Sequence, residues 1–223
     1  MEKIIIFGDS IMRGVLLDEG KYICPSEERH AREETTGLEI ENCCKFGATI
    51  EKAQTIINRR IAKGGLPERC IVEFGGNDSD FDWAAVAEAP YGEHRCKTMP
   101  EEFVQKYSEI IAALRAAGCE PMLATLPPLC AERYLDWFCR DGVDKSAVLT
   151  WLGDTNAIYR WQEYYSHLVE QTAAKNGCDV LPVREAFLAK PQKLGDRMCA
   201  DGIHPNRRGQ DLIYETIRRK FGA

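Results

Sequence analysis

The chain has 223 residues, of which 44% are hydrophobic and 29% charged, with a formal net charge of −6 at pH 7. This composition is typical of a globular domain, so it excludes wholesale disorder and fibrous architectures. The negative charge argues against a nucleic-acid partner, and no stretch approaches the ~20 apolar residues of a membrane span. We therefore expect a single domain over residues 1–223 that is cytoplasmic and has no membrane insertion.

The ten cysteines are scattered along the chain, and the spacing C-x-x-C does not occur. That spacing is typical of zinc ribbons and thioredoxin-like sites, so the sequence predicts no metal site. We expect reduced thiols that are mostly buried as small apolar side chains. The chemistry considered below requires no cofactor.

The first predicted element is a strand over residues 3–7, because a short and continuously apolar run is typical of a strand buried on both faces. Gly8 and the following DSIMRGVL predict a tight turn into a helix. Further strands are predicted over residues 39–44 and within RCIVEFGGND, and a helix over residues 50–63 lies between them. Each of these three strands ends in glycine-containing sequence.

Two later segments, residues 79–97 and 127–153, show no sustained periodicity, so they are predicted to be irregular, with at most a short helix in the first. The remaining predicted elements are regular. The first is a helix from Thr98 to Ala117, with Thr98 and Glu101 as its capping box. The next are a strand within EPMLATLPP and a helix over residues 154–175. The last are a strand within CDVLPVREAF and a helix from Pro205 to Lys220.

Five strands that alternate with helices predict an α/β fold, a three-layer α/β/α sandwich around a central, mostly parallel five-stranded sheet. In such folds ligands bind outside the carboxyl ends of the strands. The glycine-containing strand ends are therefore expected to lie along one edge, where residues distant in sequence converge.

Three of these strand ends carry residues that suit acyl transfer: Ser10 in FGDSIM, Gly47 in FGATI and Asn77 in FGGND. Each also has an ordinary interpretation, since Asp9 or Ser10 is a common helix N-cap and glycine and asparagine are common in turns. In the functional interpretation Ser10 is a nucleophile. The backbone N–H groups and the asparagine amide are then donors to a developing oxyanion.

A serine nucleophile needs a general base and a group that orients this base. Of the four histidines, only His204 has an aspartate at a short offset in a restricted backbone, Asp201 in ADGIHPN. His30 and His167 lie in predicted solvated or helical surroundings, and His94 lies in an irregular segment. The pair is either an ordinary turn or a base with its orienting acid, which would select the tautomer that leaves Nε2 free.

The four blocks FGDSIM, FGATI, FGGND and DGIHPN, in this order, resemble the GDSL/SGNH hydrolase superfamily over nearly the whole chain. The resemblance implies a flavodoxin-like SGNH hydrolase fold. It implies a triad with Ser10 as the nucleophile, His204 as the base and Asp201 as the orienting acid. It also implies an oxyanion hole formed by the N–H groups of Ser10 and Gly47 and the side chain of Asn77. The first block reads GDSI rather than GDSL, a swap of similar-sized apolar residues.

The expected activity is that of a serine hydrolase that cleaves carboxylic esters through an acyl-enzyme, with a small-molecule ester as its partner. A short-acyl esterase such as a carbohydrate O-acetylesterase is favoured, because neither irregular segment carries an extended apolar stretch to line a tunnel for a long acyl chain. A lysophospholipase or a thioesterase on the same triad is an alternative. A non-catalytic sugar-binding module is the alternative from a different class.

The irregular segments are expected to contact the substrate, because aromatic side chains in them can stack on sugars. The alternative is that these side chains only pack the segments onto the core. The candidates for substrate contacts are Asp9, Phe81, Trp83, Trp137 and Ile203, with Tyr91, Tyr134 and Trp151 as further wall residues.

Overall fold

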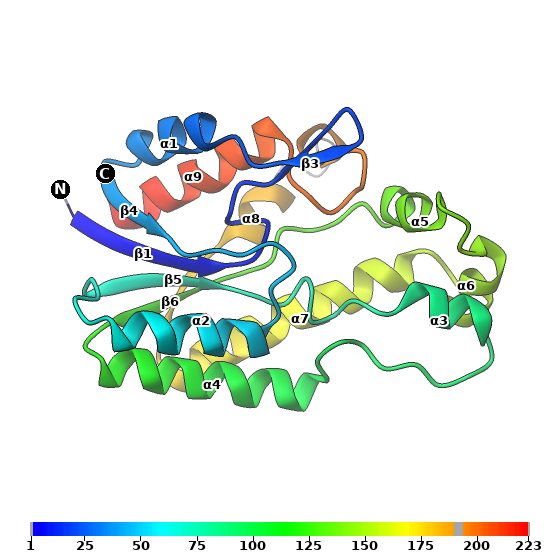
Figure 1. Ribbon diagram of the computed structural model, residues 1–223, viewed down its shortest axis with the longest axis horizontal. Helices are drawn as coiled ribbons and strands as arrows, with labels where there is room; N and C mark the ends of the chain where they lie inside the picture. The colour runs from blue at the N-terminus through cyan, green and yellow to red at the C-terminus, as the bar shows by residue number, and fades with distance from the viewer. Residues whose placement is uncertain (1, 190–193, 223) are drawn as a thin grey trace.

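The computed structural model describes residues 2–189 and 194–222, and its centre is a five-stranded parallel sheet (Figure 1). The strand order is β4-β1-β5-β6-β7, which confirms the predicted α/β sandwich. Numbered among themselves these strands run 2-1-3-4-5, the flavodoxin-like order. Their bounds are β1 Glu2–Gly8, β4 Leu38–Asn42, β5 Arg69–Glu73, β6 Glu120–Ala124 and β7 Asp179–Leu181.

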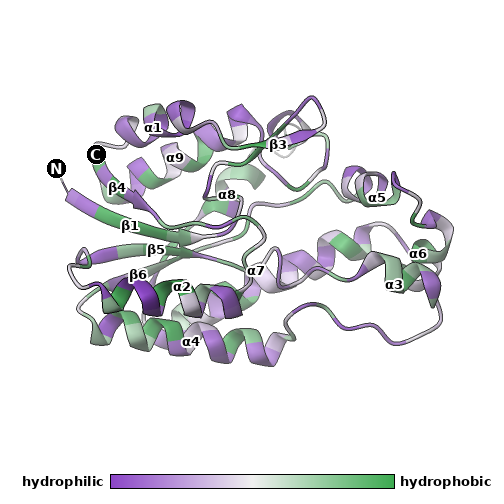
Figure 2. Ribbon diagram, in the orientation of Figure 1, coloured by the Kyte–Doolittle hydropathy of each residue, from purple (hydrophilic) through white to green (hydrophobic). Residues whose placement is uncertain are grey.

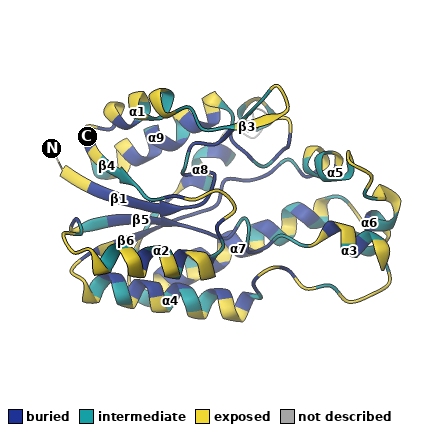
Figure 3. Cartoon of the chain, viewed as in Figure 1, coloured by how far each residue is buried: buried dark blue, intermediate teal, exposed yellow. Residues whose placement is uncertain are grey.

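Alternate residues of the buried strands face two separate cores. Ile5 and Phe7 of β1 pack with the helices on one side of the sheet, and Ile4 and Ile6 pack with those on the other. The first side carries α2 (Ile50–Ala62), α4 (Pro100–Ala116) and α7 (Asn156–Asn176), and the second carries α1 (Ser26–Thr35), α8 (Val183–Leu188) and α9 (Arg207–Phe221). Hydrophobic residues concentrate in the strands (Figure 2), and exposed residues lie on the outer faces of the helices (Figure 3).

A lobe of short helices extends beyond the carboxyl ends of the strands (Figure 1). It contains α3 (Trp83–Glu88), α5 (Ala131–Cys139) and α6 (Lys145–Leu152), packed around a small core of their own. The prediction of residues 127–153 as irregular was therefore wrong. Helices of nine and eight residues are too short to show a sustained period, and α6 depends on a local cap, since Asp144 accepts from the N–H groups of Ser146 and Ala147.

The segment after β1 is a turn and not the predicted helix. The Val15 N–H donates to the Ser10 carbonyl at 3.0 Å, and Gly14 takes φ +80°, which ends the turn. An antiparallel hairpin of β2 (Leu16–Asp18) and β3 (Lys21–Ile23) follows. Strands of three residues give no readable alternation, so the sequence did not predict this hairpin.

Two predicted helix starts also differ from the structure. Helix α9 begins at Arg207 rather than Pro205, because Asn206 is the N-cap and accepts from the Gly209 N–H at 3.1 Å. Helix α4 begins at Pro100, and Thr98 does not cap it, because the Thr98 hydroxyl donates to Asp78 at 2.6 Å.

All ten cysteines are free thiols, of which five are buried and five partly buried, so fewer are buried than the sequence predicted. In residues 2–189 and 194–222 no helix combines the length and the apolar character that crossing a membrane requires.

Candidate active site

Ser10, His204 and Asp201 form a chain of hydrogen bonds at the carboxyl edge of the sheet. Ser10 follows β1, whereas Asp201 and His204 lie in the loop that precedes α9. His204 Nε2 lies 2.9 Å from Ser10 Oγ, and His204 Nδ1 lies 2.7 Å from Asp201 Oδ2. All three side chains are buried. The structure therefore brings together the three residues that the sequence singled out as a triad.

The Asp201 carboxylate is held in place by its own loop. Its Oδ1 accepts from the backbone N–H groups of Ile203 at 3.2 Å and His204 at 3.1 Å. Burial disfavours ionisation of Asp201, but the hydrogen bonds and the charge of His204 outweigh this cost and hold the pKa of Asp201 below its usual value. An ionised Asp201 accepts from Nδ1–H, which leaves Nε2 of His204 free to accept the serine proton.

The two backbone N–H groups that the sequence predicts as oxyanion donors belong to Ser10 and to Gly47, which lies between β4 and α2. Within the described part of the chain, the N–H groups of Ser10 and Gly47 have no hydrogen-bond partner. Gly47 has φ +63°, a conformation that favours glycine, and lies in the turn closed by the bond from the Ala48 N–H to the Lys45 carbonyl.

The side chain of Asn77 is already bonded within the site. Its Nδ2 lies 2.8 Å from Asp9 Oδ2 and 3.2 Å from the Ala48 carbonyl oxygen. An amide nitrogen has two hydrogens, so an oxyanion that binds Asn77 competes with one of these acceptors. The longer bond, to Ala48, is the weaker of the two by geometry.

Asp9 belongs to a buried group of carboxyls beneath the oxyanion donors. Its Oδ1 accepts from the Ile11 N–H at 2.7 Å, and its backbone N–H donates to Glu73 Oε2 at 3.4 Å. Burial raises the pKa of Asp9 to about 6. Burial and the neighbouring Asp9 charge raise the pKa of Glu73 well above its usual value. Asp9 was a candidate substrate contact, and it lines the pocket while its carboxylate also accepts from Asn77 Nδ2.

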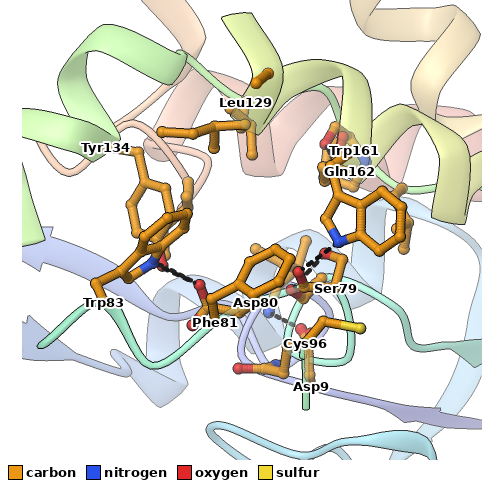
Figure 4. Close-up of a pocket in the computed structure, with 18 of the residues that line it drawn as sticks. Asp9, Ser79, Asp80, Phe81, Trp83, Cys96, Leu129, Tyr134, Trp161 and Gln162 are labelled. Carbon is orange, nitrogen blue, oxygen red and sulfur yellow. Dashed lines mark hydrogen bonds between the residues drawn. The ribbon is translucent and has the colours of Figure 1, made fainter. Parts of the chain in front are cut away.

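A pocket of about 430 Å³ opens beside Ser10 and His204 (Figure 4). Of the candidate substrate contacts, Asp9, Phe81, Trp83 and Ile203 line it, as do Tyr134 and Trp151. Sequence analysis missed Trp161 and Gln162, which also line the pocket from α7. A helical pattern gave no signal for them, because they lie near Ser10 only through the tertiary fold.

The polar groups of this pocket bond mainly to one another. Asp80 Oδ1 accepts from Trp83 Nε1 at 2.9 Å and from the Tyr134 hydroxyl at 2.7 Å, and Asp80 Oδ2 accepts from Lys97 Nζ at 2.8 Å. Trp161 Nε1 donates to the Ser79 carbonyl at 2.9 Å. The pocket consequently presents mostly aromatic and aliphatic surface to a ligand.

Two of the predicted wall residues do not line the pocket. Trp137 lies outside it, with its ring 6.2 Å from the ring of Tyr22, and Tyr91 is 91% exposed. Within the described residues no group of three or more His, Cys, Asp or Glu side chains is arranged to hold a metal ion.

Comparisons with known proteins agree with this geometry. The family model described as the GDSL-like lipase/acylhydrolase family matches residues 6–212. No curated protein matches the sequence. The solved structures that resemble the chain include a lipase/acylhydrolase from Enterococcus faecalis, with a TM-score of 0.66 and 20% identity over 99% of this chain and 95% of that one.

Two similar structures carry the name of a carbohydrate esterase. An acetyl xylan esterase gives a TM-score of 0.61 at 22% identity, covering 98% of each chain. A variant of an acetyl-xylooligosaccharide esterase from Geobacillus gives 0.67 at 17%, covering 100% of this chain and 94% of the other. At these identities the likeness shows the fold. The family model, which spans most of the sequence, shows that the chain belongs to the GDSL-like lipase/acylhydrolase family.

Proposed function

We propose that this protein hydrolyses carboxylic esters through an acyl-enzyme on Ser10. The observation that carries the proposal is the continuous hydrogen-bond chain from Ser10 Oγ to His204 (2.9 Å) and from His204 to Asp201 (2.7 Å). The N–H groups of Ser10 and Gly47, which have no hydrogen-bond partner among the described residues, support it, because an acyl-transfer intermediate needs donors at its oxyanion. A non-catalytic sugar-binding module would have no use for this arrangement.

The reaction has two stages with the same proton carrier. Ser10 Oγ attacks the ester carbonyl while His204 Nε2 accepts its proton, and Asp201 stabilises the imidazolium. The N–H groups of Ser10 and Gly47 and the side-chain amide of Asn77 bind the oxyanion. His204 then protonates the departing alcohol, and the acyl group stays on Ser10. Water attacks this ester by the reverse sequence, and the carboxylic acid leaves.

The finer proposal is a short-acyl esterase such as a carbohydrate O-acetylesterase. The pocket of about 430 Å³ supports a small substrate, because ligand pockets of this class start at about 300 Å³. Two structural neighbours named as acetylated-xylan esterases are consistent with it. The apolar walls of the pocket favour the alternative on the same triad, a lysophospholipase or thioesterase with a longer acyl group.

Hydrolysis of p-nitrophenyl esters from acetate to decanoate at pH 7.5 tests the proposal. We expect turnover of acetate and butyrate, a decline before decanoate, and no activity of Ser10→Ala. Ser79→Ala is the matched control, because Ser79 lines the same pocket but its hydroxyl donates to the Gly76 carbonyl. A maximum at decanoate would favour the long-acyl alternative, and full activity of Ser10→Ala would refute the mechanism.

A further inference from the structure

A second aromatic surface lies next to His204, outside the pocket described above. It is formed by three rings from distant parts of the chain, Tyr22 of β3, Phe46 of the turn before α2, and Trp137 of α5. We call these three residues the aromatic face. The ring of Tyr22 lies 5.4 Å from that of Phe46 and 6.2 Å from that of Trp137.

The aromatic face is open to solvent although it touches the catalytic histidine. Tyr22 is 40% exposed and Phe46 48%, among the largest exposures of any large hydrophobic side chain in the described residues. The His204 ring centroid lies 5.0 Å from that of Tyr22 and 6.0 Å from that of Phe46, with the Phe46 ring nearly parallel at 12°. Exposed aromatic rings at a reaction centre indicate a ligand contact rather than core packing.

The direction of proton transfer decides which part of an ester meets this surface. His204 Nε2 protonates the departing alcohol, so the alcohol oxygen lies beside His204. The rings of Tyr22 and Phe46 flank that same histidine. The pocket lined by Phe81, Trp151 and Trp161 also reaches Ser10, Asn77 and His204, but the rings of the aromatic face do not line it. It is therefore the space left for the acyl group.

The surroundings of the aromatic face favour a ring that carries hydroxyl groups. Lys21 and Lys45, beside Tyr22 and Phe46 in sequence, are exposed, and the Arg140 guanidinium lies 3.6 Å over the Trp137 ring. A sugar ring packs its C–H groups on an aromatic ring and keeps its hydroxyls in water or on charged donors. It therefore suits a surface of partly exposed aromatic rings with charged neighbours. A fully apolar alcohol would gain less from these charged neighbours.

We propose that the aromatic face is the leaving-group subsite and that it binds the sugar ring of an acylated carbohydrate. This inference rests on the proposed ester hydrolysis and adds the residues that bind and select the alcohol. In this arrangement the acyl group occupies the pocket beside Ser10. Tyr22, Phe46 and Trp137 then determine specificity for the alcohol.

The test uses three acetates that share one acyl group: a methyl xylopyranoside monoacetate, ethyl acetate and hexyl acetate. All three form the same acetyl-enzyme, so differences in kcat/KM report the step in which the alcohol is bound. Acetate release is measured for the wild type and for Phe46→Leu and Trp137→Leu, which keep an apolar side chain but lose the flat ring. Tyr91→Leu is the control, because Tyr91 is exposed away from the site.

We expect the wild type to prefer the sugar acetate over ethyl acetate. Each ring substitution should lower this preference, taken as the ratio of the two kcat/KM values of the same variant, by about three- to tenfold. Tyr91→Leu should leave the preference unchanged. Tyr22→Phe should also keep the preference for the sugar acetate, because it removes the hydroxyl and leaves the ring. Burial and the charge of Asp201 raise the pKa of that hydroxyl to about 12.

Four outcomes would overturn the inference. Equal preference in Phe46→Leu, Trp137→Leu and wild type would show that the rings do not bind the alcohol. A wild-type preference for hexyl acetate over the sugar acetate would assign the face to an apolar alcohol. If the wild type cleaves ethyl acetate without preferring the sugar acetate, this inference fails and the proposed function stands, whereas failure to cleave any ester removes both.

Discussion

At the scale of single residues, the predicted oxyanion donors differ in whether they already donate a hydrogen bond within the protein. The N–H groups of Ser10 and Gly47 are free within the described chain, whereas Asn77 Nδ2 is bonded to Asp9 and Ala48. Because the Asp9 carboxylate accepts from Asn77 Nδ2, we propose that Asp9 positions the amide that is predicted to bind the oxyanion. The resemblance to the family implied the donor role of Asn77, but its two bonds are visible only in the structure.

Asn77→Ala should lower kcat for p-nitrophenyl butyrate by on the order of 10²- to 10³-fold with little change in KM, because an oxyanion donor acts mainly in the transition state. Steady-state kinetics at pH 7.5 measure the effect, with a melting curve to confirm folding. Ser79→Ala is again the matched control in the same pocket. Activity of Asn77→Ala near that of the wild type would remove Asn77 from the oxyanion hole.

At the scale of elements, the position of the loop that carries Asp201 and His204 depends on its contacts with α5 of the lobe. The Cys130 N–H, at the start of α5, donates to the Gly202 carbonyl at 2.8 Å, which links α5 to the loop of Asp201 and His204. A Cβ on Gly202 would lie 2.5 Å from the Cys130 carbonyl oxygen and 2.8 Å from Arg133 Cβ. Gly202 also has φ +77°, so both space and conformation require glycine here.

Gly202→Ala should reduce kcat/KM by about 10²-fold or more, because a shift of about 1 Å in a catalytic group has this effect. Gly177→Ala is the matched control: Gly177 also has a positive φ, but a Cβ there would meet no atom within 4 Å, and it caps α7 far from the site. The control should lose about 1–2 kcal/mol of stability and keep its activity. Equal activities of the two variants would contradict this account of the loop.

The elements also show how far the sequence predicts this molecule. The strands were predictable because short apolar runs ended by glycine or proline are local signals, and His204 was singled out by its offset from Asp201. Helices α5 and α6 and the β2–β3 hairpin were not predictable, because elements of three to nine residues are too short for a period to show.

The walls of the site could be predicted only in part. Phe81, Trp83 and Trp151 lie in segments whose position over the sheet edge follows from the fold. Trp161 lies within a regular helix, and Tyr22 and Phe46 lie in a short hairpin and a turn, so no local pattern distinguishes them from packing or surface residues. Their contacts with the site come from tertiary structure alone.

At the scale of the whole molecule, the buried carboxyl of Glu73 near Ser10 lowers the stability of the fold at neutral pH. Glu73 is buried, its Oε1 has no hydrogen-bond partner among the described residues, and its pKa is raised well above the usual 4.5 by burial and by Asp9. The folded chain therefore holds a proton that the unfolded chain releases above about pH 4.5. Because the native state binds more protons, this group makes stability fall as pH rises above that value.

Glu73→Gln should consequently melt at a higher temperature than the wild type at pH 7.5, and the gain should shrink toward pH 4, where both folded and unfolded wild type carry the proton. Thermal melts at intervals between pH 4 and 8 give the comparison. Glu68→Gln, an exposed glutamate just before β5, serves as the control and should show no such trend. A gain independent of pH, or a loss at pH 7.5, would mean that Glu73 is ionised in the folded protein.

The central claim is that Ser10 is the nucleophile, activated by His204. Reaction with a p-nitrophenyl alkylphosphonate, followed by intact mass and peptide mapping, tests it most directly, because the reagent transfers one phosphonyl group to an activated serine. We predict a single adduct on the peptide that contains Ser10 in the wild type and in Ser79→Ala, slow labelling of His204→Ala, and no adduct on Ser10→Ala. An adduct on another residue, or equal labelling of Ser10→Ala, would contradict the account.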